Sequence, residues 1–466
     1  MTAQLNTGDS QQGDSAGILA DVRAVFNTGR TRPAEWRERQ LRGIELMCSE
    51  REAEISAAIT EDLGRPSFEA WLGDIASTKA EATFARKHFR AWARPRKQRI
   101  PLAHMPGRAW VQYDPLGAVL VIGPWNYPFF LSMSPVVGAV AAGNAVVIKP
   151  SELAPATSAL IARLVPRYLD PEAIRVVEGA AEVTQDLMSQ GFDHALFTGG
   201  TEVGRKIMAA AAATLTPVTL ELGGKSPVLV LPDADLDVTA RRIAWIKLLN
   251  SGQTCIAPDF VLADRSIVGP LTDKIVAAIA RFRADQQDPS LRIVNERQFD
   301  RLVSLIAGTA GTVVTGGGSD RATLRIEPTV VLGPGPDDPV MSEEIFGPIL
   351  PIIPVGSTDE AVEFVNARPR PLALYVFTGD QRTGRELVDR MPSGGAVINH
   401  LAMHCLVPTL PFGGVGASGM GAYHGQWGFE ALSHRRAVLS KPAKPDPGLL
   451  YPPYTGRAMR ILRKLL

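Results

Sequence analysis

The sequence predicts an α/β protein built on parallel sheets. Short, continuous apolar runs of the buried-strand type recur at residues 117–123, 145–149, 173–177, 194–198 and 217–222. Helical stretches lie between them, at 129–142, 155–168, 181–190 and 203–213. Strands that alternate with helices of this length form βαβ crossovers. The five strands are therefore expected to form one parallel sheet covered on both faces, with ligands bound beyond the carboxyl ends of its strands.

Composition narrows the class of protein. A chain of 466 residues is too long for one ordinary core, so two or three domains are expected. The formal net charge of +1 gives no global attraction for nucleic acid or anionic membranes. Three cysteines make a disulfide framework improbable and favour a reducing, cytoplasmic location. We find no signal peptide and no apolar run of ~18 residues, so no integral membrane segment is expected.

The region before the sheet is predicted to be helical after a flexible leader at residues 1–16. From Ile18 to about Trp92, apolar residues recur at threes and fours, and Cys48 falls on this stripe and is expected in the core. The segment Arg86 to Arg99 is basic and contains two aromatic residues. A nucleic-acid patch is the alternative, but a solvated helix end is expected because the segment is isolated in a near-neutral chain.

A second α/β segment follows the first sheet. Its strand-like runs are at 227–231, 350–354, 372–378 and 394–399. The final stretch, from about Lys441, is rich in proline and then basic, which is typical of an extended arm. Its last residues, RAMRILRKLL, interleave basic and apolar side chains, so weak peripheral contact with a membrane surface is possible.

Two glycine motifs compete as the nucleotide-binding loop. Residues 414–419 match the fingerprint GxGxxG, but no apolar strand runs into them, so a flexible loop is expected there. Gly199, Gly200 and Gly204 are less orthodox but lie between an apolar strand and a helix. The glycines allow close backbone approach, and the following helix N-terminus favours a negative group such as pyrophosphate.

The stretch from Trp245 to Phe260 places Cys255 after a helical pattern. Asp237 is the expected N-cap, and Asn250 and Gly252 are the expected stop residues. A thiol that leaves a helix on such a turn can be exposed near backbone N–H groups that favour a thiolate. For an isolated cysteine, buried packing is the commoner role.

Six motifs together resemble the aldehyde dehydrogenase superfamily. They occur in family order over roughly residues 18 to 455: PWNYP (124–128), KPSE (149–152), FTGG with VG (197–204), ELGGKSP (221–227), GQTC (252–255) and EIFGP (344–348). The runs NSGQTCIAPD, PFGGVGASGMGAYHG and YPPY resemble the class 3 branch in particular, which includes fatty, aromatic and coniferyl-type aldehyde dehydrogenases.

The resemblance implies NAD(P)-dependent oxidation of an aldehyde to its acid. Cys255 is then the nucleophile, which forms a thiohemiacetal and a thioester. The Asn126 amide and the Cys255 backbone N–H are the expected donors to the oxyanion. Glu221 is the expected general base, desolvated and raised in pKa. Because CoA-acylating relatives typically lack this glutamate, Glu221 favours hydrolysis to the free acid.

The resemblance also implies a cofactor site for NAD, with NADP possible, and no metal. Lys149 and Glu152 match ligands of the adenosine ribose, where a carboxylate favours NAD. Glu344 matches the ligand of the nicotinamide ribose, and Phe346 a residue near the ring. Trp125 is expected either in the cofactor wall or in the core. The remaining cofactor-binding residues implied are Gly199, Gly200, Val203 and Gly204.

The expected organisation is an NAD(P)-binding domain (17–95 and 117–222), a catalytic domain (223–425), and a bridging and oligomerisation element with a C-terminal arm (96–116 and 426–466). The family resemblance suggests a homodimer that takes a small-molecule aldehyde and no nucleic acid.

Some residues depart from the family pattern or have no clear role. Asn399-His400 replaces a common Asn-Asp, and His404 and Cys405 are candidates for lining or packing roles. Two alternative functions stay open: a catalytically silent binding protein on this fold, and a CoA-acylating dehydrogenase.

Overall fold

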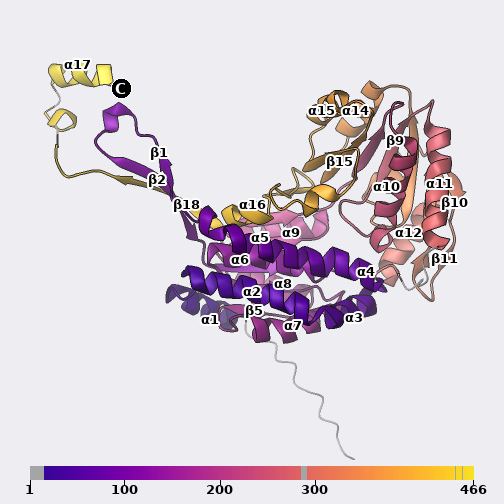
Figure 1. The fold of residues 1–466 in the computed structure, drawn as a ribbon, viewed down its shortest axis with the longest axis horizontal. Helices are drawn as coiled ribbons and strands as arrows, with labels where there is room; N and C mark the ends of the chain where they lie inside the picture. The colour runs from indigo at the N-terminus through magenta and orange to yellow at the C-terminus, as the bar shows by residue number, and fades with distance from the viewer. Residues whose placement is uncertain (1–14, 285–290, 447, 454, 466) are drawn as a thin grey trace, which may run out of the picture.

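The computed structural model describes residues 15–284, 291–446, 448–453 and 455–465. It has two large sheets with their helices and a small sheet that projects from the body (Figure 1). The predicted leader at 1–16 falls outside the described residues except for Ser15 and Ala16, which begin the first helix.

The first sheet contains the five predicted parallel strands. Its order is β17-β7-β6-β3-β4-β5, and all strands but β17 run parallel. The strands are β3 (Ala118–Ile122), β4 (Ala145–Lys149), β5 (Ile174–Val176), β6 (His194–Thr198), β7 (Val218–Glu221) and β17 (Gly419–Met420). The connecting helices are α6 (Phe130–Ala142), α7 (Pro155–Tyr168), α8 (Ala181–Ser189) and α9 (Thr201–Ala212). The predicted α/β class is confirmed.

N-terminal helices pack on this sheet through two separate apolar clusters, with the first helix in one cluster and the later helices in the other. They are α1 (Ser15–Asn27), α2 (Ala34–Glu50), α3 (Glu52–Leu63), α4 (Ser67–Ala70) and α5 (Ser77–Trp92). A π-helical turn, Trp71–Ala76, joins α4 to α5. Apolar residues of α2, α3 and α5 share a buried cluster with α6, and Cys48 lies fully buried in it as predicted.

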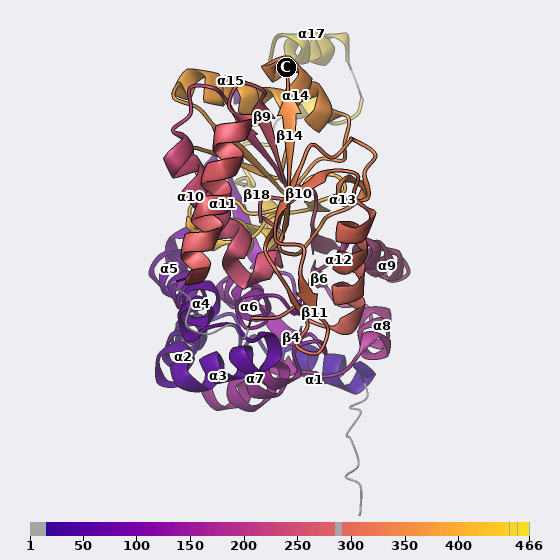
Figure 2. The same ribbon diagram turned by 90° about the vertical axis from the view of Figure 1, so that its right-hand side faces the viewer.

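The second sheet has seven strands in the order β10-β13-β14-β9-β8-β15-β16. They are β8 (Pro227–Val230), β9 (Phe260–Asp264), β10 (Thr312–Thr315), β13 (Thr329–Leu332), β14 (Ile349–Val355), β15 (Ala373–Phe377) and β16 (Gly395–Ile398). Its helices are α10 (Leu236–Leu248), α11 (Val268–Ala284), α12 (Glu296–Gly308), α13 (Pro339–Ser342), α14 (Thr358–Asn366) and α15 (Gln381–Arg390). In Figure 2 this part lies above the first sheet and the N-terminal helices.

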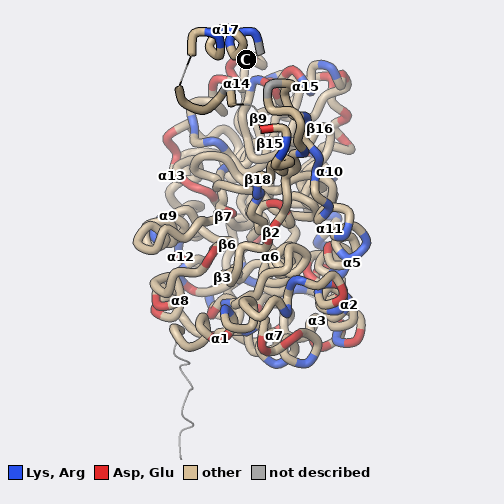
Figure 3. Tube along the Cα trace, turned by 90° about the vertical axis from the view of Figure 1, so that its left-hand side faces the viewer, with Lys and Arg blue, Asp and Glu red and all other residues tan. Residues whose placement is uncertain are grey.

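A three-stranded antiparallel sheet joins segments that are far apart in sequence. It is formed by β1 (Arg96–Gln98), β2 (Arg108–Pro115) and β18 (Ser433–Ser440). Helix α16 (Gly425–Ala431) precedes β18, and the arm beyond it ends in α17 (Gly456–Leu465). The β1–β2 hairpin and α17 project away from the body (Figure 1), and α17 contains Lys and Arg residues, drawn in blue in Figure 3.

The structure bears on two expectations, one about the basic segment 86–99 and one about membrane-spanning helices. In the basic segment 86–99, Arg86 is ion-paired with Glu45 and Arg90 with Glu38, which is the pattern of a solvated helix end. Among the described helices, none is both long enough and apolar enough to cross a membrane.

Candidate active site

Helix α10 directs the chain to Cys255. Its N-cap is Asp235, not the predicted Asp237, because the Asp235 carboxylate accepts the backbone N–H groups of Asp237 and Val238. Asp237 already lies in the first helical turn, where an acidic side chain still favours the helix N-terminus.

A left-handed turn ends the helical segment before Cys255. Asn250, Ser251 and Gly252 have φ values of 49°, 55° and 72°. Asn250 and Gly252 thus terminate the helix as predicted. Glycine is required at the third position, since a Cβ there would lie 2.3 Å from the Gly347 carbonyl oxygen.

Cys255 is partly exposed and lies on the wall of a cavity. Burial raises the pKa of its thiol well above the ordinary value, and negative charge on Glu344, Cys405 and Glu221 adds to the effect. The backbone hydrogen bond predicted to favour the thiolate does lower the pKa of Cys255, but desolvation and carboxylate charge outweigh it. A thiol in this setting requires a base.

The cavity beside Cys255 is mostly apolar. Its hydrophobic and aromatic lining comprises Leu72, Tyr127, Phe130, Leu131, Trp245, Ile246, Leu249, Ile256, Ala402, Met403, Leu406, Phe412 and Tyr423. Polar and sulfur groups complete it: Arg65, Glu69, Ser77, Thr254, Cys405 and His424. The sequence missed most of this lining, because it is drawn from α4 to α6, α10 and the 402–424 region, and no local pattern relates these segments.

Glu221 ends β7 as a buried carboxyl, with 3% of its surface exposed. Neither carboxyl oxygen has a hydrogen-bond partner within the described part of the chain. Burial raises the pKa of Glu221 well above its ordinary value, as predicted. Such a carboxyl accepts a proton strongly once it is ionised.

The GxGxxG run at 414–419 has a structural function beside Glu221. Its last residue begins β17, and Gly419 pairs with Glu221 across the antiparallel ladder. The Leu222 N–H also donates to the Ser418 carbonyl oxygen at 3.1 Å. The run is a loop, as predicted, but its end covers the edge of β7 and holds the strand that carries Glu221.

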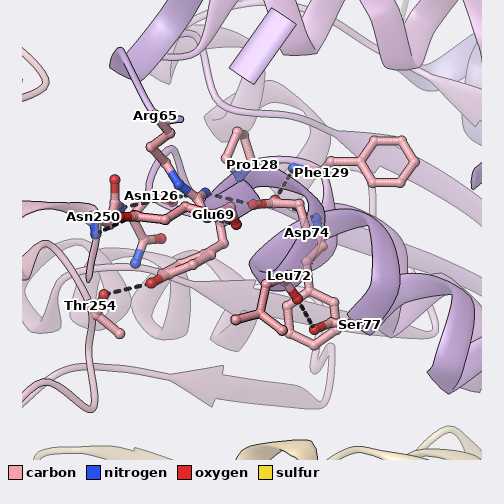
Figure 4. Close-up of polar contacts among 12 residues, drawn as sticks. Arg65, Glu69, Leu72, Asp74, Ser77, Asn126, Pro128, Phe129, Asn250 and Thr254 are labelled. Carbon is pink, nitrogen blue, oxygen red and sulfur yellow. Dashed lines mark hydrogen bonds and ion pairs between the residues drawn. The ribbon is translucent and has the colours of Figure 1, made fainter. Parts of the chain in front are cut away.

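Asn126 lies against the loop of the candidate nucleophile. Its side-chain amide donates to the Gln253 carbonyl oxygen at 3.1 Å. The amide of Asn250 in turn donates to the Asn126 carbonyl oxygen at 2.9 Å (Figure 4). Asn126 is almost fully buried, so these bonds fix its amide beside the residues that lead to Cys255.

The candidate adenosine-side ligands lie at the carboxyl ends of β4 and β6. Lys149 Nζ and Glu152 Oε2 are 2.6 Å apart; the lysine is buried and the glutamate partly exposed. Gly200 precedes α9, and a Cβ at this position would meet no atom within 4 Å. At Gly204 a Cβ would lie 2.5 Å from the Leu222 side chain, so this glycine serves helix packing. Val203 is half exposed on α9.

The candidate nicotinamide-side residues come from three segments: Trp125 follows β3, Gly223 follows β7, and Glu344 and Phe346 precede β14. Trp125 and Phe346 contact edge to face, with ring centroids 5.3 Å apart. A Cβ on Gly223 would lie 1.8 Å from Glu344 Oε2, so the glycine makes room for this carboxyl. Burial, with the charge of Asp259, raises the pKa of Glu344 to about 8.

The loop that carries Glu344 is anchored by residues that the sequence reasoning missed. Lys225 forms an ion pair with Asp259 and donates to the carbonyl oxygens of Val340 and Glu343, each at 2.8 Å. Asp259 accepts the Ile345 N–H at 2.8 Å. Lys225 lies within the ELGGKSP motif and Asp259 within the NSGQTCIAPD run, so the motifs contained a signal for both.

The residues without a predicted role divide into two groups. Asn399 binds both backbone groups of Thr378, which is a structural role at a strand end. Cys405 lines the cavity, and His404 packs against Phe412. Burial, together with His424, lowers the pKa of His404 to about 4, so His404 is neutral.

The residues present fit a nicotinamide dinucleotide. An open glycine turn after β6 precedes a helix N-terminus, and a lysine and a carboxylate lie at the carboxyl end of β4 in the same sheet. A glycine makes room for the partly buried Glu344 carboxyl, near two aromatic rings. These groups are the ones that pyrophosphate, ribose hydroxyls and a nicotinamide ring require.

The chain belongs to the aldehyde dehydrogenase family: the family model for "Aldehyde dehydrogenase family" matches residues 2–438. It is an oxidoreductase that converts aldehydes to acids with a nicotinamide nucleotide.

Its relatives include members of aldehyde dehydrogenase family 3. Member H1 from Arabidopsis thaliana is 44% identical over 97% of this chain and 95% of its own length. Member A2 from Mus musculus is 46% identical over 93% of this chain and 90% of its own length. The predicted class 3 resemblance is confirmed.

Solved structures share the fold. The substrate-bound AldH of Staphylococcus aureus has a TM-score of 0.93 and 39% identity, covering 97% of this chain and 99% of that one. The NAD-dependent aldehyde dehydrogenase of Sinorhizobium meliloti has a TM-score of 0.86 and 30% identity, covering 93% of this chain and 88% of that one.

Proposed function

We propose that this enzyme oxidises apolar aldehydes through a covalent adduct on Cys255. One observation carries the proposal: Cys255 lies on the wall of a mostly apolar cavity and within charge range of Glu221, a buried carboxyl whose oxygens have no partner in the described chain. A carbonyl compound with an apolar tail fits such a cavity, since its tail is removed from water while its carbon meets the sulfur.

We assign the steps of the reaction to three residues of the chain. Glu221 removes the thiol proton of Cys255, and the thiolate sulfur adds to the carbonyl carbon, which leaves the negative charge on oxygen. Asn126 and the Cys255 backbone N–H donate to that oxyanion. After hydride loss the adduct is a thioester. Glu221 releases the thiol proton to solvent and then takes a proton from water, whose oxygen attacks the thioester carbon and displaces the sulfur. That second proton passes from Glu221 to the sulfur, which leaves the acid and the free thiol.

The proposed cofactor contacts follow the strand ends. Gly199, Gly200 and the start of α9 receive the pyrophosphate, and Lys149 with Glu152 receives the adenosine ribose. Glu344 holds the nicotinamide ribose, with Trp125 and Phe346 beside the ring. When bound, the nicotinamide accepts the hydride that the adduct loses. A partly exposed carboxylate at Glu152 favours NAD over NADP, whose extra phosphate it repels.

An aldehyde panel with each nucleotide tests this proposal. Linear aldehydes of increasing chain length should show kcat/KM rising with length, and hydrophilic aldehydes of similar size should react slowly. Cys255→Ala should abolish oxidation while nucleotide binding is retained. Equal rates for apolar and hydrophilic aldehydes would show that the apolar cavity does not select the substrate. Nucleotide binding without turnover would favour a silent protein, and a strict requirement for CoA would favour the acylating reaction.

We also propose that the enzyme is a homodimer joined through the projecting sheet. Leu102 is 86% exposed beside the hairpin and Leu439 is 57% exposed on β18. Apolar side chains on a projecting antiparallel sheet favour burial against a second copy. Light scattering should give twice the chain mass, and Leu439→Glu should shift the enzyme towards monomer. A monomeric parent enzyme at micromolar concentration would contradict the proposal.

A further inference from the structure

A buried ion pair lies behind the loop that carries Asn126. Arg65 follows α3, Asp74 lies on the π-helical turn, and the two side chains are 1% and 0% exposed. Arg65 Nη1 donates to Asp74 Oδ2 at 2.6 Å (Figure 4). Removing two charges from water carries a large desolvation cost, and a buried pair often contributes no net stability. A role other than stability is therefore the better explanation for this pair.

Asp74 holds the beginning of α6. Its Oδ1 accepts the backbone N–H groups of Phe129 at 3.1 Å and of Phe130 at 3.0 Å (Figure 4). These groups belong to the first turn of the helix, where N–H groups have no intrahelical acceptor and a negative charge is favoured. Since Asn126 lies only three residues before Phe129, Asp74 fixes the point from which the Asn126 loop departs.

Arg65 holds the same loop from its other side. Its guanidinium lies over the Tyr127 ring, 4.4 Å from the centroid, and Nη1 lies 3.5 Å from the Asn126 carbonyl oxygen. A Cβ on Gly73 would lie 2.6 Å from Arg65 Nη2 and 2.7 Å from Tyr127 Cε1. The π-helical turn therefore presents a glycine where the stacked pair leaves no space for a side chain.

The loop held by this pair contacts the residues on both sides of Gly252. The Tyr127 hydroxyl lies 2.9 Å from Thr254 Oγ1, next to Cys255. The Asn126 amide bonds the Gln253 carbonyl, and the Asn250 amide bonds the Asn126 carbonyl. The pair is thus linked through one loop to Gln253 and Thr254, the two residues before Cys255.

We propose that Arg65 and Asp74 are positioning residues that hold the Asn126 amide where the oxyanion forms. This inference rests on the proposed role of Asn126 as an oxyanion donor. An oxyanion donor acts only when it is aimed at the place where charge develops, so a small displacement is costly. The pair then affects acyl chemistry at Cys255 and leaves both nucleotide binding and the intrinsic reactivity of the thiol unaffected.

The test uses variants that preserve the hydrogen bonds of the helix start. Arg65→Met with Asp74→Asn removes both charges together, and asparagine can still accept the two N–H groups. Arg65→Lys is a milder variant that keeps the charge but loses the planar stack on Tyr127. Should the double variant fail to fold, Arg65→Lys carries the test alone.

Three assays on the full-length enzyme separate the possible effects. Hydrolysis of para-nitrophenyl acetate without nucleotide forms an oxyanion at Cys255, and its kcat is expected to fall on the order of 10- to 100-fold while KM changes little. Alkylation of Cys255 by iodoacetamide forms no oxyanion and is expected to stay within about twofold. The dissociation constant of NAD should also stay within about twofold. Equal losses in all three assays, or no loss of hydrolysis, would overturn the proposal.

A matched control distinguishes positioning from support of a helix start. Asp62 is also buried and accepts two backbone N–H groups, those of Ala156 at 2.9 Å and Thr157 at 2.8 Å, at the beginning of α7. Asp62 accepts one N–H group through each carboxyl oxygen, so Asp62→Asn loses an acceptor and should lower the melting temperature, without a fall in ester hydrolysis. A comparable fall in Asp62→Asn would show that any loosened helix start impairs the chemistry.

Asn126→Ala separates failure of this inference from failure of the proposed function. If Asn126→Ala leaves ester hydrolysis unchanged, Asn126 is not a donor and both ideas fail. If Asn126→Ala slows hydrolysis but the Arg65 and Asp74 variants do not, only the positioning role fails. If the inference holds, the pair variant combined with Asn126→Ala should be little slower than Asn126→Ala alone, because both changes remove one interaction.

Discussion

Glu221 is a buried carboxyl and Glu344 a partly buried one, and the two lie in contrasting surroundings of one site. Burial raises the pKa of both. The oxygens of Glu221 have no partner among the described residues, whereas Glu344 accepts a hydrogen bond from the Gly224 backbone and lies near the positive charges of Lys225 and Arg301. A carboxyl without donors is suited to take a proton, and one held by donors is suited to hold a ligand. A raised pKa in both carboxyls therefore does not imply an equal role.

Glu221→Gln should produce the larger loss of the two. The substitution keeps the size of the side chain but removes its capacity as a base, so kcat for acid formation should fall on the order of 10²- to 10⁴-fold. The dissociation constant of NAD, measured by fluorescence quenching, should stay unchanged. If nucleotide binding were lost together with turnover, Glu221 would serve nucleotide binding, as Glu344 is proposed to do.

The pH dependence of the parent enzyme sharpens this prediction. The pKa values of both the Cys255 thiol and the Glu221 carboxyl are raised, so both groups hold their protons at pH values where the ordinary carboxyl has lost its own. We expect kcat/KM to rise with pH as the pair ionises, at pH values above the range in which an ordinary carboxyl ionises. In Glu221→Gln the rise should follow the thiol alone, and an unchanged profile would contradict the assigned base.

Glu344→Gln should affect the nucleotide instead. Glutamine offers one acceptor oxygen in place of two, so the KM and the dissociation constant of NAD are expected to rise on the order of tenfold. Glu343→Gln is the matched control, because Glu343 is the exposed neighbour on the same loop and should change neither constant. A large fall in acid formation with unchanged NAD affinity would show that Glu344 acts in the chemical step and not in nucleotide binding.

The sequence predicted these two carboxyls and the first sheet for different reasons. Strands β3, β4 and β6 are five-residue runs that are buried throughout, so composition alone identifies them. The sequence missed β2 and β18, whose residues are mostly half buried or exposed and mixed in polarity. Glu221 and Glu344 were found through motifs, since nothing local distinguishes them from other glutamates.

Properties that depend on distant neighbours were beyond the sequence. The pKa of Cys255 is raised partly by Glu344 and Cys405, which lie far along the chain, so the local turn predicted the opposite direction. Arg65 follows α3 among polar and helix-forming residues, and no pattern indicated that it is buried beside Tyr127. Tertiary contacts decide such electrostatic properties, and the sequence order of the segments does not reveal them.

The smallest predicted effect is on stability, and it follows from the pKa of Glu344. The folded-state pKa of about 8 exceeds the ordinary value of 4.5, so between these values the folded state binds more protons than the unfolded state. Stability contributed by protonated Glu344 is therefore present at low pH and is lost as the pH rises through about 8.

Melting temperatures of nucleotide-free enzyme between about pH 5.5 and about pH 8.5 measure this loss. Glu344→Gln cannot ionise, so its melting temperature should gain a few degrees on the parent as the pH rises. The contribution of Glu221 is common to both proteins and cancels in the difference. Glu343→Gln should parallel the parent, and a Glu344→Gln curve that also runs parallel would mean that Glu344 is already ionised at low pH, as a ligand-holding carboxylate with stronger donors would be.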